Sequence, residues 1–163
     1  MNKQIYIGVD NGLGGALVAL DSTYVAELLV MPTITSTKNK REYDIYEIVE
    51  FFKRYPDAIV ILEKAHALPK LGTVQSFNFG KGFGMMMGIL AALKMKYHIV
   101  HAKTWQKQMF KDINYTDTKQ ASAIVAQRLF PKIDFKATQR SRKIHDGLTD
   151  ALLLGSYGQR MNL

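Results

Sequence analysis

The chain has 163 residues and no cysteine, and 47% of its residues are hydrophobic, which predicts a globular chain with one core. The lack of thiols excludes disulfides, thiol nucleophiles and thiolate zinc sites, so a metal would need carboxylate or histidine ligands. The formal net charge is +8, and basic residues outnumber acidic ones most clearly between Lys94 and Lys143. This excess favours a polyanionic partner, and a basic surface without a specific partner is the alternative.

No segment has the length and apolarity of a membrane anchor. The longest apolar run, Phe83 to Leu93, is interrupted by glycines and is much shorter than the roughly 20 residues that a span needs. The N-terminal segment lacks the apolar stretch of a signal peptide. We therefore expect no membrane association and a cytoplasmic location, in a host if the gene is viral. No repeat or linker divides the chain, so residues 1–163 are predicted to form one domain.

The N-terminal third predicts three consecutive antiparallel strands. They are expected at Gln4 to Asp10, Gly14 to Asp21 and Tyr24 to Pro32, which are apolar runs bounded by Gly, Asp-Ser and Pro. Thr33 to Glu42 follows them and is polar and charged, without any apolar period. This pattern predicts a mobile loop that crosses from the third strand to a helix.

The next two elements are a helix and a buried strand. Asp44 and Glu47 have the spacing of a capping box, and apolar residues recur at helical spacing as far as Tyr55, before Pro56 ends the helix. The uninterrupted branched run from Ala58 to Leu62 is typical of a strand that is covered on both faces. This strand is predicted to end at the carboxylate of Glu63.

The second half predicts a loop, three helices and one strand. The expected elements are a loop at His66 to Val74, a helix at Gln75 to Lys96, a strand at His98 to Ala102, a helix at Thr116 to Phe130, and a last helix at about His145 to Arg160. The Thr116 to Phe130 helix should face inward through Ala121, Ile124, Val125 and Leu129. The last helix should pack on the sheet through Leu148, Ala151, Leu152 and Gly155.

Three glycines share one face of the predicted Gln75 to Lys96 helix. Gly80, Gly84 and Gly88 recur every four residues, and each costs up to about 1 kcal/mol in a helix interior. Their register predicts close approach by another backbone. Packing of the helix on the sheet is one explanation, and a partner subunit or a DNA strand is the other.

Four acids occupy positions from which they can meet. Asp10 and Glu63 end strands that would be neighbours in the middle of the sheet, and Asp146 and Asp150 lie one turn apart on the last helix. Carboxylates that converge in this way repel one another unless a cation neutralises them. The cluster therefore predicts one or two Mg²⁺ or Mn²⁺ ions and, in a basic protein, phosphodiester hydrolysis.

Each of these acids also has a simpler structural explanation. Asp10 can cap the turn at Asn11-Gly12, Glu63 can pair with Lys64, and Asp146 can be the N-cap of the last helix. The combination of all four acids on rigid elements favours the metal site.

Six segments together resemble a known family. IYIGVDNGLGGALVAL, IVILEKAHALP, SFNFGKGFGMMMGIL, VHAKTWQK, TKQASAIVAQRLFP and HDGLTDALLLGSYGQR are similar, in order and spacing, to the RuvC-like Holliday-junction resolvases, particularly the compact phage and viral branch. The resemblance runs from about Ile5 to Arg160. It implies a ribonuclease H-like α/β fold, with a central mixed five-stranded sheet flanked by helices.

The resemblance implies roles for individual residues. Asp10 would bridge two Mg²⁺ ions, which Mn²⁺ is expected to replace, and Glu63, Asp146 and Asp150 would complete the ligands. Lys119 falls where these resolvases place a lysine near the scissile phosphate; an exposed helix lysine is the alternative. The family's C-terminal acids lie three residues apart, whereas Asp146 and Asp150 are four apart, which leaves His145 as an alternative to Asp146 as the fourth ligand.

Basic residues in the second half are predicted to contact phosphates: Lys103, Lys107, Arg140, Arg142 and Lys143. Phe77 and Phe79 are either core residues or wedges for the centre of a DNA junction, and Trp105 is either a core residue or a stacking platform. A four-way junction is two-fold symmetric, so we expect a homodimer, with the Gly80/Gly84/Gly88 face as its contact.

The sequence thus predicts a Mg²⁺-dependent, structure-selective endonuclease that resolves branched DNA by paired symmetric nicks, leaving 5′-phosphate and 3′-hydroxyl ends. A ribonuclease H acting on RNA–DNA hybrid is one alternative, and a non-catalytic junction-binding module is another. The segment GVDNGLGGA also suits an actin-like ATPase, but such proteins need two domains to enclose a nucleotide, so no nucleotide cofactor is expected.

Overall fold

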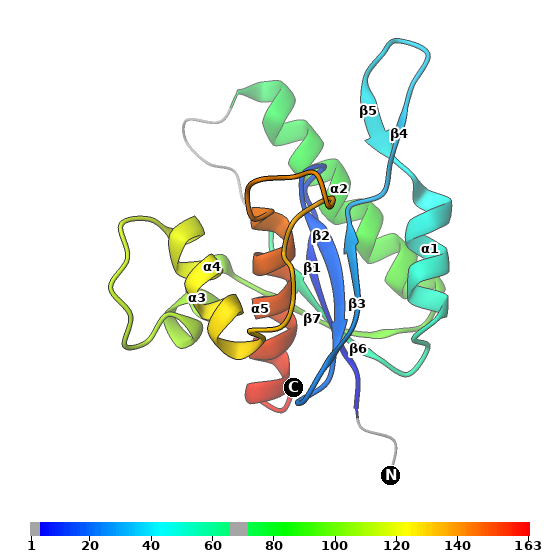
Figure 1. Ribbon diagram of the computed structural model, residues 1–163. Helices are drawn as coiled ribbons and strands as arrows, with labels where there is room; N and C mark the ends of the chain where they lie inside the picture. Colours follow the sequence, from blue (N-terminus) through cyan, green and yellow to red (C-terminus); the bar gives the residue numbers. More distant parts are fainter. Residues whose placement is uncertain (1–3, 66–71) are drawn as a thin grey trace.

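The fold is built around a five-stranded mixed sheet. The computed structural model describes residues 4–65 and 72–163 (Figure 1). The sheet has the order β3-β2-β1-β6-β7, in which β6 and β7 run parallel to β1 and the first three strands are antiparallel. Its strands are β1 (Tyr6–Asp10), β2 (Ala16–Leu20), β3 (Val25–Val30), β6 (Ile59–Glu63) and β7 (Lys96–Val100). The prediction of three antiparallel strands and of a strand ending at Glu63 is confirmed.

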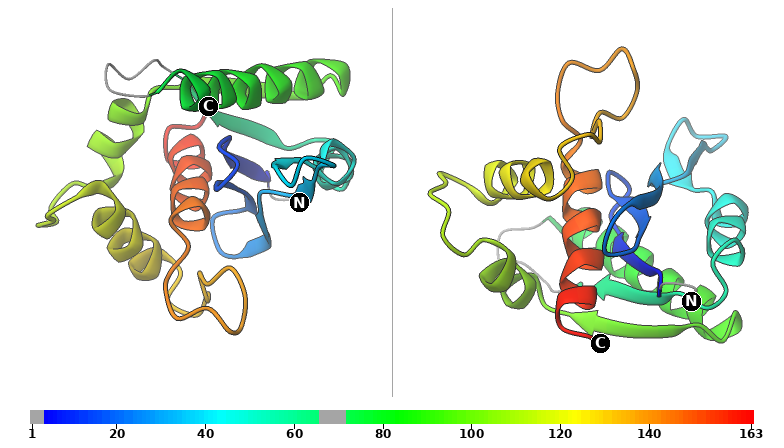
Figure 2. Two further views of the ribbon diagram at one scale, coloured as in Figure 1. Left: turned by 90° about the horizontal axis from the view of Figure 1, so that it is seen from above. Right: turned by 60° about the horizontal axis from the view of Figure 1, so that its bottom comes forward.

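Helices cover both faces of this sheet (Figure 2). One face packs against α1 (Ile45–Lys53) and α2 (Thr73–Ala92), whose side chains share a core with Ile7 and Val9. The other face packs against α3 (Ala102–Met109), α4 (Thr118–Leu129) and α5 (Asp146–Arg160). None of the helices in the described ranges is both long and apolar enough to cross a membrane.

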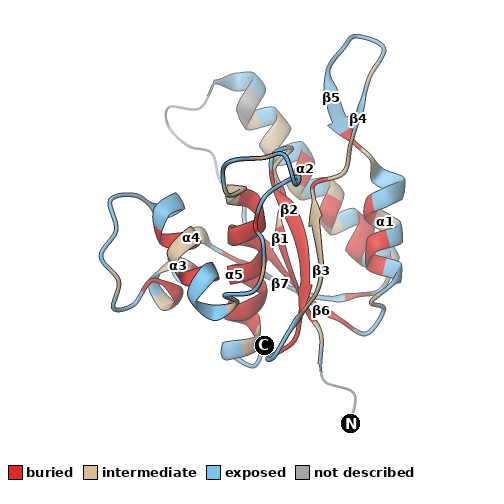
Figure 3. Ribbon diagram, in the orientation of Figure 1, coloured by how far each residue is buried: buried red, intermediate tan, exposed pale blue. Residues whose placement is uncertain are grey.

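The helix α5 lies directly on β1. A Cβ atom at Gly8 would lie 1.8 Å from the Ala151 carbonyl oxygen and 2.6 Å from the Gly155 backbone nitrogen. A side chain at Gly147 would likewise collide with the backbone of Gly15. Nearly all of α5 is buried as a result (Figure 3). Glycines on both elements therefore set the distance between the end of β1 and the first turns of α5.

Residues 33–43 form a hairpin, and the prediction of a loop there is wrong. β4 (Thr33–Thr35) and β5 (Arg41–Tyr43) pair in antiparallel register, and the turn between them is closed by a hydrogen bond from the Asn39 backbone N–H to the Ser36 carbonyl oxygen (2.9 Å). Most of this ribbon is exposed. Because neither of its faces is buried, its sequence lacks the apolar alternation that indicates a strand.

Other differences from the predictions are local. The strand predicted at His98 to Ala102 lies two residues earlier, α3 was not predicted, and Leu129 is exposed rather than inward-facing. The capped helices are confirmed: the side chains of Asp44 and Asp117 accept hydrogen bonds from the backbone N–H groups of Glu47 and Gln120. Most of the predicted loop from His66 to Val74 lies outside the described residues.

The face of α2 that carries Gly80, Gly84 and Gly88 does not pack on the sheet. Packing of this face on the sheet was one of the two explanations offered for these glycines. A Cβ atom at Gly80, Gly84 or Gly88 would meet no atom within 4 Å among the described residues. The glycine of α2 that packs tightly is Gly82, where a Cβ would lie 2.3 Å from the Tyr43 hydroxyl. The three glycines thus leave an open, exposed face on the helix.

Candidate active site

Sheet register brings Asp10 and Glu63 together. β1 and β6 are parallel neighbours, and their register pairs Val9 with Leu62, so the next residue on each strand is the acid. Successive side chains alternate between the two faces of a sheet. Since Val9 and Leu62 belong to the core on the α1 and α2 side, both acids lie on the face that α5 covers. The parallel arrangement thus places two carboxylates side by side at the C-terminal edge of the sheet.

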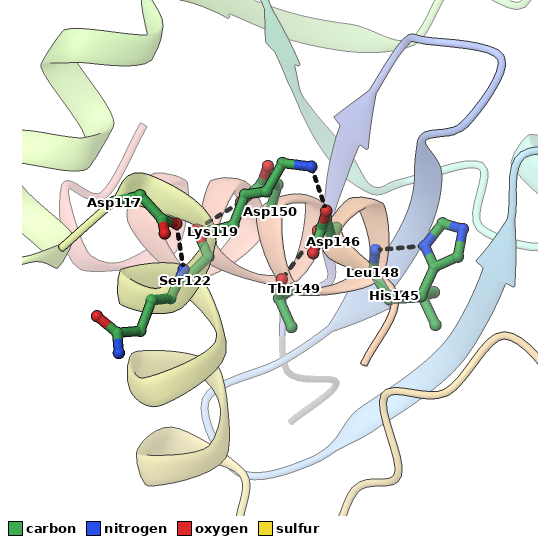
Figure 4. A network of polar contacts seen from close by, with 9 residues as sticks. Asp117, Lys119, Ser122, His145, Asp146, Leu148, Thr149 and Asp150 are labelled. Carbon is green, nitrogen blue, oxygen red and sulfur yellow. Dashed lines mark hydrogen bonds and ion pairs between the residues drawn. The ribbon is translucent and has the colours of Figure 1, made fainter. Parts of the chain in front are cut away.

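The helix α5 adds two more acids to this edge. Asp146 is its first residue and Asp150 follows one turn later, so both project from the same side of the helix (Figure 4). Asp150 is largely buried against α4, whereas the side chain of Asp146 is 47% exposed. The cluster therefore contains an inner pair, Asp10 and Asp150, and an outer acid, Asp146.

Burial and mutual repulsion change the acidity of the inner pair. The pKa of Asp10 is raised from 3.8 to about 7, mainly by burial and also by the charges of Asp150, Glu63 and Asp146. Burial also raises the pKa of Asp150 to about 6, with contributions from Glu63 and Asp146, although the Ser122 hydroxyl opposes the rise. The four acids thus act on each other electrostatically, as the sequence predicted for a cluster. Perturbed acids in such a cluster are typical of functional sites.

Each carboxylate is held by a different partner. The Asp10 side chain accepts a hydrogen bond from the backbone N–H of Gly12 (3.3 Å), as the simpler explanation of this acid predicted. Asp146 forms an ion pair with the Lys119 ammonium (2.7 Å). Figure 4 shows this pair and the contact in which the Ser122 hydroxyl donates to Asp150 (2.5 Å). Lys119 and Ser122 both come from α4, so this helix supports the acids of α5.

The partner of Glu63 is Trp105. This side chain is fully buried, and its indole Nε1 donates a hydrogen bond to Glu63 Oε2 over 2.8 Å. Trp105 lies on α3, which follows β7, and its ring packs edge-on against Phe110. The core explanation of Trp105 is thus confirmed, and the tryptophan additionally fixes the orientation of a candidate ligand. Its helical spacing from Met109 is a sequence signal that indicates an inward position.

His145 caps the last helix. Its Nδ1 accepts a hydrogen bond from the backbone N–H of Leu148 (3.3 Å), so the N-cap is His145 and not Asp146. Burial lowers the pKa of this histidine, and Arg41 lowers it further against the opposing effect of Asp146. Since capping uses Nδ1, only Nε2 remains for a metal ion.

Residues behind the acids form a second layer that the sequence analysis missed. Asn11 is buried, and its amide donates to the Glu63 carbonyl oxygen over 2.7 Å. The Tyr43 hydroxyl donates in turn to the Asn11 carbonyl oxygen (2.8 Å). Burial, together with the charge of Asp10, raises the pKa of Tyr43 to about 12, so this hydroxyl stays a donor. The end of β1 is thereby joined to β6 and to the β4–β5 hairpin.

The donor set fits a hard divalent cation. In the described ranges no three acids or histidines are already arranged around a common metal position, and Glu63, Asp150 and Asp146 contact Trp105, Ser122 and Lys119, respectively. Carboxylate oxygens are nevertheless the ligands that Mg²⁺ prefers, and a cation would relieve the repulsion that raises the pKa of Asp10 and Asp150. The Oδ1 atom of Asn11, the residue after Asp10, is also buried and has no hydrogen-bond partner among the residues that the structure describes.

The basic residues predicted to contact DNA are all exposed, and they lie on two segments. Lys103 and Lys107 project from α3, whereas Arg140, Arg142 and Lys143 lie on the connection that leads into α5. The second group is therefore adjacent in the chain to His145 and Asp146. Of the two predicted wedges, Phe77 is 69% exposed at the start of α2 and Phe79 is half-buried.

Comparison with solved structures identifies the fold. The RuvC structure of Thermus thermophilus superposes with a TM-score of 0.65 at 15% identity, over 98% of this chain and 97% of that one. The T. thermophilus RuvC in complex with Holliday junction substrate gives 0.64 at 13% identity, over 97% and 96%. No family model and no curated protein matches the chain. The protein thus has the ribonuclease H-like fold of RuvC, and the predicted fold class is confirmed.

Proposed function

We propose that this protein is a Holliday-junction resolvase, a Mg²⁺-dependent endonuclease that cuts branched DNA by paired symmetric nicks. The observation that carries the proposal is the convergence of Asp10, Glu63, Asp146 and Asp150 at one edge of a ribonuclease H-like sheet. A basic chain whose structural neighbours include RuvC with a Holliday junction supports DNA as the substrate. The products would carry 5′-phosphate and 3′-hydroxyl ends.

The four acids would hold one or two Mg²⁺ ions, and Mn²⁺ is expected to substitute. A metal ion held there would supply activation of the attacking water and stabilisation of the leaving oxygen. The chain's own residues keep the acids in place. Trp105 fixes one oxygen of Glu63, Ser122 orients Asp150, and Asn11 ties β1 to β6.

Lys119 is proposed to act on the scissile phosphate. Its ammonium is exposed and pairs with Asp146, the outermost acid, and the hydrogen bond with Asp146 raises its pKa, so Lys119 remains charged. If Asp146 held a cation, this pair would open and leave the Lys119 ammonium available beside the acids. A positive charge at that place can bind a phosphate oxygen and stabilise the charge that develops during hydrolysis.

The assembly and the DNA contacts belong to the same proposal. Arg140, Arg142 and Lys143 would bind phosphates next to the acids, Lys103 and Lys107 would bind them farther away, and Phe77 would serve as the wedge. A homodimer would place two sites in fixed relation on a two-fold symmetric junction. The open face at Gly80, Gly84 and Gly88 is available for this contact. Disulfide trapping through cysteines at these positions tests that assignment, and failure to trap a dimer that forms in solution contradicts it.

Cleavage of a labelled four-way junction in Mg²⁺ tests the function. Linear duplex and RNA–DNA hybrid serve as parallel substrates, and Asp10→Asn serves as the variant without catalysis. We expect symmetric, ligatable nicks in the junction alone, lost in Asp10→Asn while junction binding persists. Cleavage of the hybrid would indicate a ribonuclease H instead, and tight junction binding without any cleavage would indicate a binding module.

A further inference from the structure

The β4–β5 hairpin holds the chain segment that follows Asp10. The Tyr43 hydroxyl, at the end of β5, donates a hydrogen bond to the Asn11 carbonyl oxygen over 2.8 Å. Two residues earlier on the same strand, Arg41 donates from Nη2 to the Leu13 carbonyl oxygen over 2.9 Å. The hairpin stands at the end of the sheet at which β1 ends (Figure 1). It therefore binds two carbonyl groups of the turn directly after the first acid.

The same turn is bonded to both strand-end acids. The backbone N–H of Gly12 donates to Asp10 Oδ1 (3.3 Å), and Asn11 Nδ2 donates to the Glu63 carbonyl oxygen (2.7 Å). Asn11 thus accepts a hydrogen bond from Tyr43 on its carbonyl and donates one to Glu63 from its side chain. Since Asn11 also follows Asp10 directly in the chain, a shift of its backbone reaches both acids.

The helix α2 encloses the hydrogen bond between Tyr43 and Asn11. The two residues are only 6% and 1% exposed, respectively. A Cβ atom at Gly82 would collide with the Tyr43 hydroxyl and would lie 2.6 Å from the Asn11 carbonyl oxygen, so glycine alone fits there without displacing them. A hydrogen bond that is shielded from water is electrostatically stronger than an exposed one. The Tyr43 hydroxyl is thus held in one position against the carbonyl.

We propose that Tyr43 is a positioning residue that sets the affinity of the acids for a divalent cation. Its hydroxyl holds Asn11, and Asn11 holds the ends of β1 and β6 together, so that Asp10 and Glu63 form a preorganised pair. Preorganised ligands bind more tightly, because less conformational freedom is lost when the ion binds. The inference rests on the proposed metal site and deepens it, because it makes the β4–β5 hairpin part of the framework of that site.

Trp105 provides a readout that does not depend on catalysis. It is the single tryptophan of the chain, it is fully buried, and its indole Nε1 donates to Glu63 Oε2 over 2.8 Å. The fluorescence of the indole therefore reports a movement of Glu63 in the protein without metal. A change in this emission shows that the acid has moved, whatever the activity of the protein.

The test compares Tyr43→Phe with Tyr55→Phe. Both changes keep the ring and remove a hydroxyl that donates a hydrogen bond, but Tyr55 donates to Glu27 (3.0 Å) and lies near the start of β6, at the other end from Glu63. Calorimetric titration with Mn²⁺ should give a Kd about tenfold weaker for Tyr43→Phe and an unchanged Kd for Tyr55→Phe. In chelator, the tryptophan emission should change in Tyr43→Phe alone. Urea denaturation measures the stability that each variant loses.

Three results would overturn the inference. If Tyr43→Phe loses stability but keeps the wild-type Kd for Mn²⁺ and the wild-type emission, its hydroxyl has a structural role only. If Tyr55→Phe weakens Mn²⁺ binding as much as Tyr43→Phe does, the effect follows from lost stability and not from position. A wild type that binds no Mn²⁺ would leave Tyr43 no ligands to position.

Cleavage assays separate this inference from the proposed function. If the wild type cuts four-way junctions and Tyr43→Phe needs no more Mg²⁺ than the wild type, the positioning role is wrong and the resolvase assignment stands. If the wild type cuts no junction, yet its Mn²⁺ affinity depends on the Tyr43 hydroxyl, the positioning role stands and the resolvase assignment is wrong.

Discussion

The inner and outer parts of the acidic cluster are built differently. Asp10 and Asp150 lie where α5 packs on β1 through glycines, and burial raises the pKa of both acids. Asp146 and Lys119 lie at the rim, with side chains 47% and 72% exposed, and they are joined by an ion pair. Exposed ion pairs contribute little to stability and rearrange easily. The comparison indicates a rigid part that holds the two inner acids and an adaptable part at the rim; in the proposed function, the first would position metal ligands and the second would respond to the substrate.

Replacement of an inner acid should therefore cost more activity than replacement of the outer one. We expect Asp10→Asn to lower junction cleavage by about 10³-fold or more, because it removes the carboxylate that we propose as the central metal ligand. Asp146→Asn should cost roughly 10–100-fold, because an exposed ligand can be replaced in part by water or by His145. Single-turnover cleavage rates measure both, and junction binding serves as the control. Equal losses would show that the inner and outer acids are equivalent.

Two glycine substitutions compare the stability of the tight β1–α5 contact with that of the open face of α2. Gly8→Ala places a methyl group against the backbone of Ala151 and should destabilise the fold by about 3 kcal/mol, with cleavage reduced further in the folded fraction. Gly84→Ala meets no neighbour and should stabilise α2 by up to about 1 kcal/mol. Urea denaturation of the metal-free protein measures both. A tolerated Gly8→Ala would show that α5 can shift on β1 without cost.

The elements that hold the inner acids could be predicted because their patterns reflect burial. Alternation in β1 and the apolar run of β6 placed Asp10 and Glu63 at adjacent strand ends, and helical spacing placed Asp150 on an inward face. The β4–β5 hairpin could not be predicted in this way, since a ribbon exposed on both faces needs no apolar alternation.

Contacts between residues far apart in the sequence could not be predicted either. Trp105 reaches Glu63 over 42 residues, and Ser122 reaches Asp150 over 28. Such contacts depend on how α3 and α4 pack against α5, and no local pattern encodes that packing. The same holds for Gly82, which packs closely on Tyr43, whereas the sequence predicted close approach of another backbone at Gly80, Gly84 and Gly88.

Trp105 tests whether the rigid part depends on hydrogen bonding or on packing alone. Trp105→Phe removes the donor to Glu63 and retains an aromatic ring, so we expect a 10–100-fold weaker metal affinity and a matching rise in the Mg²⁺ concentration needed for cleavage. Calorimetric titration with Mn²⁺ measures the affinity. Phe110→Leu, which changes a ring that packs on Trp105, is the packing control. An unchanged Mg²⁺ requirement in Trp105→Phe would leave the tryptophan a purely structural role.

The pH dependence of stability distinguishes the inner acids in the metal-free protein. A carboxyl group whose pKa is raised from 3.8 to about 7 on folding stabilises the native state fully below about pH 4, and this contribution is lost as the pH rises through 7. In chelator, the free energy of unfolding of the wild type should therefore fall by about 2 kcal/mol more than that of Asp10→Asn between pH 5 and pH 8. Added Mg²⁺ should restore the wild type at pH 8 and have little effect on the variant, because the cation offsets the charge that the variant lacks. If the free energies of unfolding of the two proteins changed equally with pH, burial would not raise the pKa of Asp10. The distinction between a rigid inner pair and an adaptable rim would then have no electrostatic basis.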